Sequence, residues 1–396
     1  MRSPTLFCST ILLMSAATGA QAQQPAEPAP DVPFARALND TGQTRCTRDL
    51  ATFTTNCAGT GQDASSGRDV DFPAPANGHA GFAFVKVCNS GEAAGTGTCS
   101  AHAVLGTGPD DWGCVIDRVT ALEWEVKEAS GGVRDFRTLY TNHGDGRPGD
   151  ASAFVATVNA NGLCGESDWR LPAVDELQGL ADYGRASPQA SIDPRFFPNT
   201  LAGIYWTQEN SVAYGEHHSA WTANFAIDGT DVGTMPYERL QAHAVRLVRP
   251  AQGSAKLLAQ RDARATSAHD IEVAAQHVFW QRCSVGQEWN GTSCIFAPRV
   301  FTAERAIAYA KELAAETGLP WRVPNVKELS ALALRTRVDP AMDTSIFPGA
   351  SSTSHWTSTV NASSPAQGWA VDFGPGAAFT LDQSNRAALR LIRDAD

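Results

Sequence analysis

Two stretches of the chain combine alanine with apolar residues near helical spacing and hold little glycine or proline. They span residues 151–160 and 303–317, and each runs into a glycine, Gly162 or Gly318. Alanine has the highest intrinsic helix propensity, and glycine often follows the last turn because it adopts positive φ without steric cost. We therefore predict a helix over each stretch, ending at its glycine.

A second helix is predicted after a proline in each half, Pro172 and Pro324. A proline here presets φ, and its missing N–H costs nothing in a first turn. The pattern then changes to period two, typical of half-buried strands, in WTANFAI and WAVDFGP and in VRLVR and LRLIR. Each half is thus predicted as two helices followed by short antiparallel strands, with a lead strand at Trp124 or Trp280. The fold class is α+β.

The two halves repeat one another. DWRLPAVDEL at 168–177 is matched by PWRVPNVKEL at 320–329. Other landmarks recur in the same order: LEWE and VFWQ, IDPRFFP and VDPAMDTSIFP, YWT and HWT, WTANF and WAVDF, VRLVR and LRLIR. Solenoid units run to about 20–50 residues, much shorter than this repeat. We conclude that one domain has been duplicated in tandem.

The repeated motif is interpreted mainly as structural. We predict core tryptophans between the two helices and an arginine–carboxylate pair beside them, because a buried indole removes about 150–250 Å² from water. The residues are Trp169, Arg170, Pro172 and Glu176 in one half and Trp321, Arg322, Pro324 and Glu328 in the other. Trp206 and Trp356, in YWT and HWT, are likewise predicted as core. A ligand contact through the motif, or a sugar stacked on these strand tryptophans, is the alternative.

The amino terminus is typical of a secretory signal. Arg2 is followed by a short apolar run, and Ala20-Gln21-Ala22 forms a small-x-small cleavage site. The run is shorter than the roughly 20 apolar residues that span a bilayer, and no later segment qualifies. We expect residues 1–22 to be removed and the mature chain to be exported to the periplasm, the outer surface or the medium.

Removing the signal removes Cys8 and leaves eight of the nine cysteines. An even number in an exported chain favours disulfides, although eight cysteines allow about 105 pairings. Pairing neighbours predicts Cys46–Cys57, Cys88–Cys99 and Cys283–Cys294, which leaves Cys114 with Cys164. Zinc is the competing interpretation, but neither CxxC nor HExxH occurs. We predict no metal and no cofactor.

Acidic residues outnumber basic ones, and the net charge is −11. This balance argues against nucleic acid or an anionic membrane as partner, because phosphate binding needs clustered lysine and arginine. The sequence also lacks GxSxG, a P-loop and GxGxxG after a strand, so no standard nucleophile or phosphate cradle is predicted. The oligomeric state does not follow from the sequence.

TALEWEVK, LCGESDWRLPAVDEL, IDPRFFP, YWT and VRLVR together resemble the Lcl C-terminal domain, named for a bacterial collagen-like adhesin and long a domain of unknown function. The resemblance covers about 110–250 and, less fully, 275–396. TGQTRC (41–46) and GQDASSGRD (61–69) also resemble sequence that accompanies this domain in exported proteins. The order of elements is similar to the C-type lectin-like fold, although the calcium-binding tripeptides EPN, QPD and WND are absent. The resemblance implies an extracellular domain that binds glycans or proteins and has no catalytic residues to transfer.

We predict the following organisation: signal peptide 1–22, unstructured lead 23–33, a cysteine- and glycine-rich region 34–108, a first domain 109–250, a linker 251–270 and a second domain 271–396. The region 34–108 holds one apolar run, GFAFVKV (81–87), which predicts a strand. The region either extends the first domain or forms a small subdomain held by disulfides.

The predicted function is binding, without enzyme activity, of a glycan or an extracellular protein. The alternatives are an enzyme of the formylglycine-generating branch of the same fold, which needs reactive cysteines, and a purely structural envelope protein. Loops between YWT and VRLVR differ most between the halves, so Tyr205, Tyr214 and Tyr237 are the candidate ligand contacts. If a ligand binds by stacking on these tyrosine rings, its affinity is expected to change little when salt is added.

Overall fold

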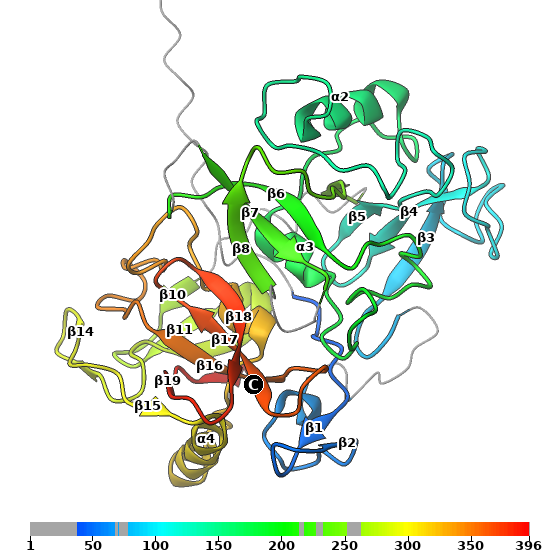
Figure 1. Cartoon of the computed structure of the whole chain (residues 1–396). Helices are drawn as coiled ribbons and strands as arrows, with labels where there is room; N and C mark the ends of the chain where they lie inside the picture. Colours follow the sequence, from blue (N-terminus) through cyan, green and yellow to red (C-terminus); the bar gives the residue numbers. More distant parts are fainter. Residues whose placement is uncertain are drawn as a thin grey trace, which may run out of the picture. The chain divides into compact units, whose positions relative to one another are not determined.

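Both halves of the chain contain two corresponding, mainly antiparallel sheets and two corresponding helices (Figure 1). The computed structural model describes residues 38–67, 70, 78–213, 218–226, 233–251 and 263–395, which lie within one unit, Val32–Asp396. The predicted signal peptide and the 23–33 lead lie outside the described residues. Mixed helix and antiparallel sheet confirm the α+β class.

In the first half, one sheet has the order β3-β4-β5-β9 and the other β6-β7-β8. The strands are β3 (Phe84–Cys88), β4 (Trp112–Asp117), β5 (Leu122–Glu125), β6 (Ile204–Asn210), β7 (Ser219–Asn224), β8 (Gly233–Glu238) and β9 (Val248–Pro250). The helices are α2 (Ala151–Asn161) and α3 (Val174–Gly179).

In the second half, the corresponding orders are β10-β11-β12-β20 and β15-β19-β16-β17-β18. The strands are β10 (Ala263–Ala265), β11 (Asp270–Val273), β12 (Val278–Gln281), β15 (Val300–Phe301), β16 (Ser354–Val360), β17 (Gln367–Asp372), β18 (Ala377–Asp382), β19 (Ala387–Ala388) and β20 (Ile392–Asp394). The helices are α4 (Ala303–Thr317), α5 (Val326–Ser330) and the short 3-10 turn η2 (Ala274–Gln276), and a small hairpin pairs β13 (Glu288–Trp289) with β14 (Cys294–Ile295).

Strand register confirms the duplication. Trp124 pairs with Val248 in the first half, and Trp280 pairs with Ile392 in the second. The same two carboxy-terminal strands receive an isolated bridge from the repeated arginine, Arg170 to Val248 and Arg322 to Ile392. The parallel pairing of β16 with β19 also has a counterpart, a single bridge between Tyr205 and Ala244.

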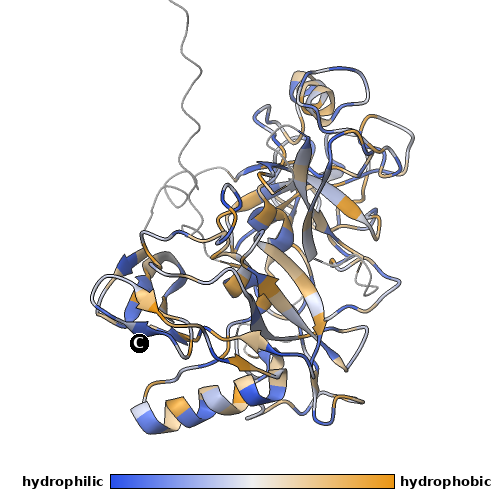
Figure 2. Cartoon of the chain, turned by 60° about the vertical axis from the view of Figure 1, so that its left-hand side comes forward, coloured by the Kyte–Doolittle hydropathy of each residue, from blue (hydrophilic) through white to orange (hydrophobic). Residues whose placement is uncertain are grey.

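The predicted long helices are confirmed. Helix α2 begins after Asp150 and reaches Gly162, and α4 begins after Thr302 and reaches Gly318. Each glycine has a φ near +70°, which suits a residue without Cβ. Their buried faces occupy matching positions: Ala151, Phe154 and Val158 in α2, and Ala303, Ala306 and Ala310 in α4. Figure 2 shows hydrophilic and hydrophobic residues interleaved along α4, as expected of a helix with one buried face.

The motif tryptophans are buried, but not where the sequence placed them. Trp169 packs with α2 residues and with Trp206 of β6, and Trp321 packs with α4 residues and with Trp356 of β16. The buried residues of α3 and α5 belong to a different cluster. Each indole therefore lies between the long helix and the strand sheet rather than between two helices, because the short helix turns its apolar side to the other half.

The carboxy-terminal segments VRLVR and LRLIR differ from the predicted strand pattern. Only their last residues join a ladder, in β9 and β20. Arg246 and Arg390 are fully buried instead of lying on a solvent face. Arg246 donates to Glu125 O and Thr200 Oγ1, and Arg390 donates to Gln281 O, so backbone and hydroxyl oxygens replace water.

The region 34–108 divides between the two halves. Strand β3, which confirms the strand predicted at GFAFVKV, pairs with β4 and extends the first domain. Residues 38–67 carry β1 (Cys46–Thr47), β2 (Phe53–Thr54) and η1 (Asp63–Ser65) and contact the second domain as well.

The predicted linker, residues 251–270, needs correction at its carboxy-terminal end. Strand β10 pairs with β11, so residues 263–270 belong to the second domain's sheet. Residues 252–262 lie outside the described part.

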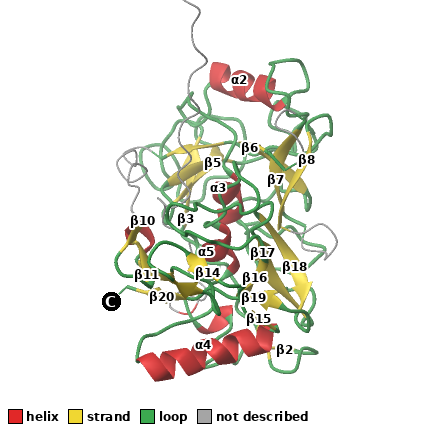
Figure 3. Cartoon of the chain, turned by 90° about the vertical axis from the view of Figure 1, so that its left-hand side faces the viewer, coloured by secondary structure: helices red, strands yellow, loops and turns green. Residues whose placement is uncertain are grey.

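Helices α3 and α5 meet where the two domains join (Figure 3). Ser330 Oγ donates to Gln178 Oε1 at 2.7 Å, and these two residues each directly follow the repeated decapeptide. Strands β8 and β18 also lie together, with Ala378 N donating to Thr234 Oγ1 at 3.0 Å. Equivalent elements therefore face each other, as in a symmetric dimer made within one chain.

Candidate functional site

The repeated arginine and glutamate form the predicted ion pair in both domains. Arg170 donates to both carboxylate oxygens of Glu176, at 2.7 and 2.8 Å, and Arg322 binds Glu328 with the same two distances. Each glutamate also accepts the backbone N–H of the helix N-cap residue, at 2.7 Å. Pro172 and Pro324 directly precede those N-cap residues, as predicted. One carboxylate thus joins the arginine to the start of the short helix.

The predicted tyrosine contacts need correction. Tyr205 is 1% exposed, its ring packs against Phe225, and its hydroxyl accepts from Leu201 N at 2.9 Å. It belongs to the core, because it packs in the cluster with Phe225 on the face of β6 opposite Trp206. Tyr237 is half-buried and packs edge-on against His243, which in turn packs on Trp206. Tyr214 lies outside the described residues. The structure does not bring Tyr205 and Tyr237 together into one exposed surface.

A cavity of about 580 Å³ opens in the first domain between α2 and β6. Its lining residues come from the loop before α2, from α2, from the repeated motif, from strand β6 and from the turn after β8. They are Asn142, His143, Gly144, Ser152, Val155, Arg170, Leu171, Gln208, Asn210 and Arg239. Amides, guanidinium groups and an imidazole line it together with the apolar side chains of Val155 and Leu171, so the cavity offers hydrogen-bond donors beside apolar surface.

Arg239 supplies positive charge to this cavity. Its guanidinium donates to Asn142 O and to Asn210 Oδ1, two neutral acceptors. Within the described part of the chain, no carboxylate lies at ion-pair distance from it. Burial lowers the pKa of Arg239, and the charge of Asp150 acts in the opposite direction. Because a guanidinium has five N–H donors, these two contacts leave donors for a ligand.

Asp150 holds the loop that forms one wall of the cavity. Its carboxylate accepts from His143 N at 2.6 Å, Gly144 N at 3.1 Å and Ser152 N at 3.0 Å. Burial raises the pKa of Asp150, but these hydrogen bonds outweigh it and leave the pKa lowered. The acidic, glycine-rich loop 142–150 is therefore ordered around a helix cap.

The comparison with protein-family models gives two matches to the Lcl C-terminal domain, at residues 113–249 and 273–393, well over half of the chain. The chain belongs to the Lcl C-terminal domain family. Among curated proteins and among solved structures, nothing matches it. The C-type lectin-like assignment therefore stays a prediction, whereas the tandem Lcl organisation is established.

The N-terminal segment, residues 38–67, contacts helix α4 and strand β16 of the second Lcl domain. Ile307 and Lys311 of α4 contact Gly61, and Lys311 Nζ donates to Gly59 O at 2.7 Å. At the strand, Thr359 Oγ1 donates to Asp63 Oδ2 at 2.6 Å.

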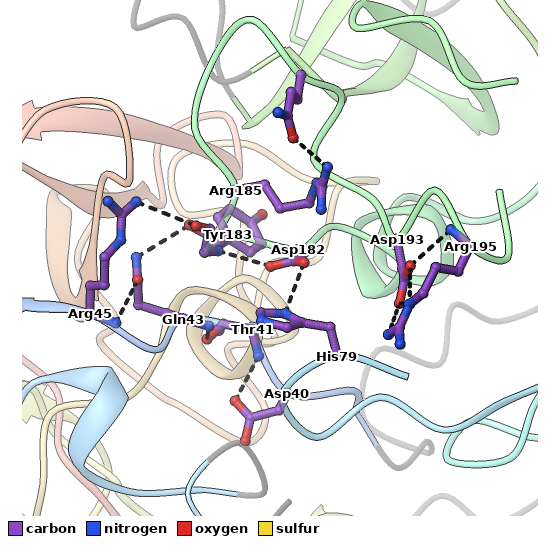
Figure 4. A network of polar contacts seen from close by, with 12 residues as sticks. Asp40, Thr41, Gln43, Arg45, His79, Asp182, Tyr183, Arg185, Asp193 and Arg195 are labelled. Atoms are coloured by element: carbon purple, nitrogen blue, oxygen red, sulfur yellow. Dashed lines mark hydrogen bonds and ion pairs between the residues drawn. The ribbon is translucent and has the colours of Figure 1, made fainter. Parts of the chain in front are cut away.

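Further contacts tie the N-terminal segment to both domains (Figure 4). Gln43 Nε2 donates to Tyr183 O at 3.2 Å and to Val360 O at 3.0 Å. Arg45 donates to Gly184 O and to Ala362 O. The segment therefore lies along the junction and binds a backbone carbonyl of each domain.

A second cavity, of about 520 Å³, borders this segment and the second domain. Its lining includes Asn39, Asp40, Asp63, Arg322, Asn325 and Glu328. Burial and the nearby charge of Asp40 raise the pKa of Asp63 to about 7, against hydrogen bonds from Thr359 and Thr41. Burial likewise lowers the pKa of Lys327 to about 7, although Asp40 and other carboxylates oppose it. This cavity is acidic and belongs to the junction.

All eight cysteines of the predicted mature chain form the four predicted disulfides: Cys46–Cys57, Cys88–Cys99, Cys114–Cys164 and Cys283–Cys294. Among the described residues, one group has the geometry of a metal site, namely Cys114, Cys164 and Glu123. Its two sulfur atoms are bonded to each other, so they are not thiolate ligands. No described helix is both long and apolar enough to cross a membrane.

Proposed function

We propose that this protein is a non-enzymatic, exported binding protein that holds a polar ligand in the cavity of its first Lcl domain. The observation that carries the proposal is Arg239, a cation whose acceptors among the described residues are both neutral, in an open cavity of about 580 Å³. A glycan and a polypeptide are the two ligand classes that such a wall of donors suits. The four disulfides support an oxidising compartment, the periplasm or outside the cell.

In this proposal the ligand is recognised by hydrogen bonds and by the charge of Arg239, and not by stacking on exposed tyrosine rings. Gln208 and Asn210 are exposed on β6, and Arg170 lies beside them with its charge balanced by Glu176. Arg239 then contributes one net positive charge to an otherwise acidic protein. An ionic contact at an exposed site is screened over a distance of about 10 Å at 0.1 M salt. Binding is therefore expected to weaken as salt is added.

The test is to probe glycan and peptide arrays with the purified mature protein, its Arg239→Ala variant and an Arg305→Ala control. Arg305 lies on α4 in an exposed ion pair with Glu312, far in sequence from the cavity residues. We expect ligands that bind the wild type and the control but lose at least tenfold affinity for Arg239→Ala. If every ligand found binds Arg239→Ala as well as it binds the wild type, the cavity is not the site.

A further inference from the structure

Three asparagines of the chain stand in the sequence Asn-x-Ser/Thr, the acceptor motif for N-linked glycosylation. They are Asn39 (NDT), Asn290 (NGT) and Asn361 (NAS), and none has proline at the middle position. The motif is short and arises often by chance, so the surroundings of each asparagine in the folded chain decide whether a transferase reaches it. An acceptor has to expose its side-chain amide and leave room for an oligosaccharide.

The structure buries two of these asparagines. Asn39 is 2% exposed and donates its amide N–H to Asp117 Oδ2. Asn361 is 0% exposed, and its Nδ2 donates to Gln367 Oε1 at 2.9 Å. In both side chains the nitrogen that would carry a sugar is already a donor inside the protein. A glycan on either asparagine is therefore incompatible with this fold.

Asn290 lies in the opposite environment. It is exposed at the turn of the hairpin that joins β13 to β14, at the periphery of the molecule in Figure 1. Gly291 and Thr292, the other two residues of the motif, are exposed as well. Gly291 has a φ of +100°, and a Cβ placed there would meet no other part of the chain within 4 Å. The turn thus has open space around it, while the Cys283–Cys294 disulfide ties β14 to the second domain.

Local hydrogen bonds hold the Asn290 side chain by its oxygen. The Oδ1 accepts from Thr292 N and Thr292 Oγ1, each at 3.0 Å, and from Ser293 N at 2.9 Å. Such an Asx turn uses the carboxamide oxygen and leaves Nδ2 without an acceptor among the described residues. Glu288, two residues before the asparagine, is exposed and offers a carboxylate to a basic group of a transferase.

We propose that Asn290 is an acceptor site for N-linked glycosylation of the exported chain. The donor is an oligosaccharide joined through a pyrophosphate to a polyprenyl lipid, and the catalyst is an oligosaccharyltransferase. A bond forms between Asn290 Nδ2 and C1 of the first sugar, and the bond between C1 and the phosphate oxygen breaks. The lipid pyrophosphate leaves, and the amide nitrogen gives one proton to a base of the transferase. The inference goes beyond the proposed function and shares with it only the export of the chain.

The test isolates the full exported chain from the cells that naturally produce it and maps its tryptic peptides by mass spectrometry. The peptide that holds Asn290 spans residues 283–299, between Arg282 and Val300. We expect an oligosaccharide on this peptide and none on the peptides of Asn39 and Asn361. The readout is the mass of the intact oligosaccharide, because an Asn-Gly sequence also deamidates spontaneously and that change would mimic enzymatic removal of a glycan.

Variants made in the same cells separate the motif from its surroundings. Asn290→Gln and Thr292→Ala are expected to lose the glycan, whereas Thr292→Ser, which retains the hydroxyl, should keep it. Asn385→Gln removes another exposed asparagine, one outside the motif, and is the matched control that should stay glycosylated. An exported wild type without a glycan on Asn290, or with one on Asn39 or Asn361, overturns this inference alone. Retention of the chain in the cytoplasm would remove the export on which both proposals depend.

Discussion

Equivalent single residues of the two domains keep their hydrogen-bond geometry while their chemistry changes. Glu125 and Gln281 each accept a backbone N–H from the last strand segment, and each supplies its backbone oxygen to a buried arginine. Only Glu125 is charged, and Lys127 pairs with it at 2.8 Å. Thr207 and Thr357 both donate to a tryptophan carbonyl at 2.8 Å. The fold therefore keeps the positions of these hydrogen-bond acceptors the same in both domains, while the charge of the side chain differs.

His355, which replaces Tyr205 of the first domain, makes the second domain sensitive to acid. Burial, together with the positive charge of Arg390, lowers the pKa of His355 to about 3. Its Nε2 lies 2.9 Å from Ser284 Oγ. Since a histidine in the unfolded chain titrates near 6.5, the unfolded state binds the proton more readily between pH 6.5 and 3. This contribution to stability is complete above pH 6.5 and is lost as the pH falls.

We expect the wild type to lose up to about 1.4 kcal/mol of unfolding free energy per pH unit in this window relative to His355→Gln. Urea unfolding at pH 7 and pH 5 measures the difference. The comparison between proteins is essential, because Asp63, whose pKa is raised, acts in the opposite direction over an overlapping range. Ser284→Ala should lower stability but keep the acid dependence. Equal losses for wild type and His355→Gln would assign the acid sensitivity to other groups.

Among the secondary-structure elements, the caps of the long helices connect folding with the cavity. Thr302 caps α4 by accepting from Arg305 N alone, whereas Asp150 caps α2 and also holds the preceding loop. The loop is possible because the first domain inserts residues between the strand bridge at Tyr140 and the helix. One carboxylate therefore orders both a helix terminus and a wall of the candidate site.

Asp150→Ala is expected to lower the unfolding free energy by about 1–2 kcal/mol through loss of the cap. It should also weaken the binding of any ligand that contacts His143 or Asn142, since the loop loses the two hydrogen bonds that His143 N and Gly144 N donate to the carboxylate. Asp150→Asn keeps a side-chain oxygen and serves as the matched control, with a smaller effect on both quantities. Urea unfolding and ligand titration measure the two effects separately. A variant that loses stability but binds unchanged would show that the loop is not part of the site.

At the scale of the whole chain, the two domains contact each other through equivalent positions, but different residue types occupy those positions. Tyr183 packs edge-on against Trp369 at 4.8 Å, and Arg335 lies 5.5 Å from the ring centroid of Trp221. Trp221 and Trp369 are the tryptophans of WTANF and WAVDF, so the two contacts are related by the pseudosymmetry. Arg335 also pairs with Asp175 at 2.7 Å. One hydrophobic cluster includes residues of both domains, which couples their folding.

Arg335→Ala is expected to lower the unfolding free energy by about 2–4 kcal/mol, because it removes the ion pair with Asp175 across the junction and one of the two hydrogen bonds of the buried Ser330 hydroxyl. The wild type should unfold in a single calorimetric transition. Arg337→Ala, which removes an exposed arginine two residues away, is the matched control and should cost little. Two separate transitions in the wild type would contradict the coupling of the domains through this junction.

Local patterns were enough to predict the duplication, the two long helices and the motif ion pairs, whereas the cysteine pairing stayed one prediction among about 105 possible pairings until the structure confirmed it. Those features depend on residues close in sequence or on a repeat that is visible without coordinates. The burial of Tyr205, Arg246 and Arg390 was decided by tertiary structure, because period-two alternation does not say which face meets another element. The cavity at Arg239 was also missed. Comparing the two repeats would have shown that the first has an arginine, Arg239, where the second has a glutamine, Gln383. Only the packed structure reveals that Arg239 borders an open cavity.

The role of residues 38–67 shows the same division most clearly. TGQTRC and GQDASSGRD were recognisable as sequence that accompanies the Lcl domain, and their cysteine pairing was predictable from spacing. That Asp63 meets Thr359, nearly three hundred residues later in the chain, follows from no local rule. Contacts between distant segments depend on how the two domains pack, and the free energy of that packing is summed over the whole core rather than encoded in a motif.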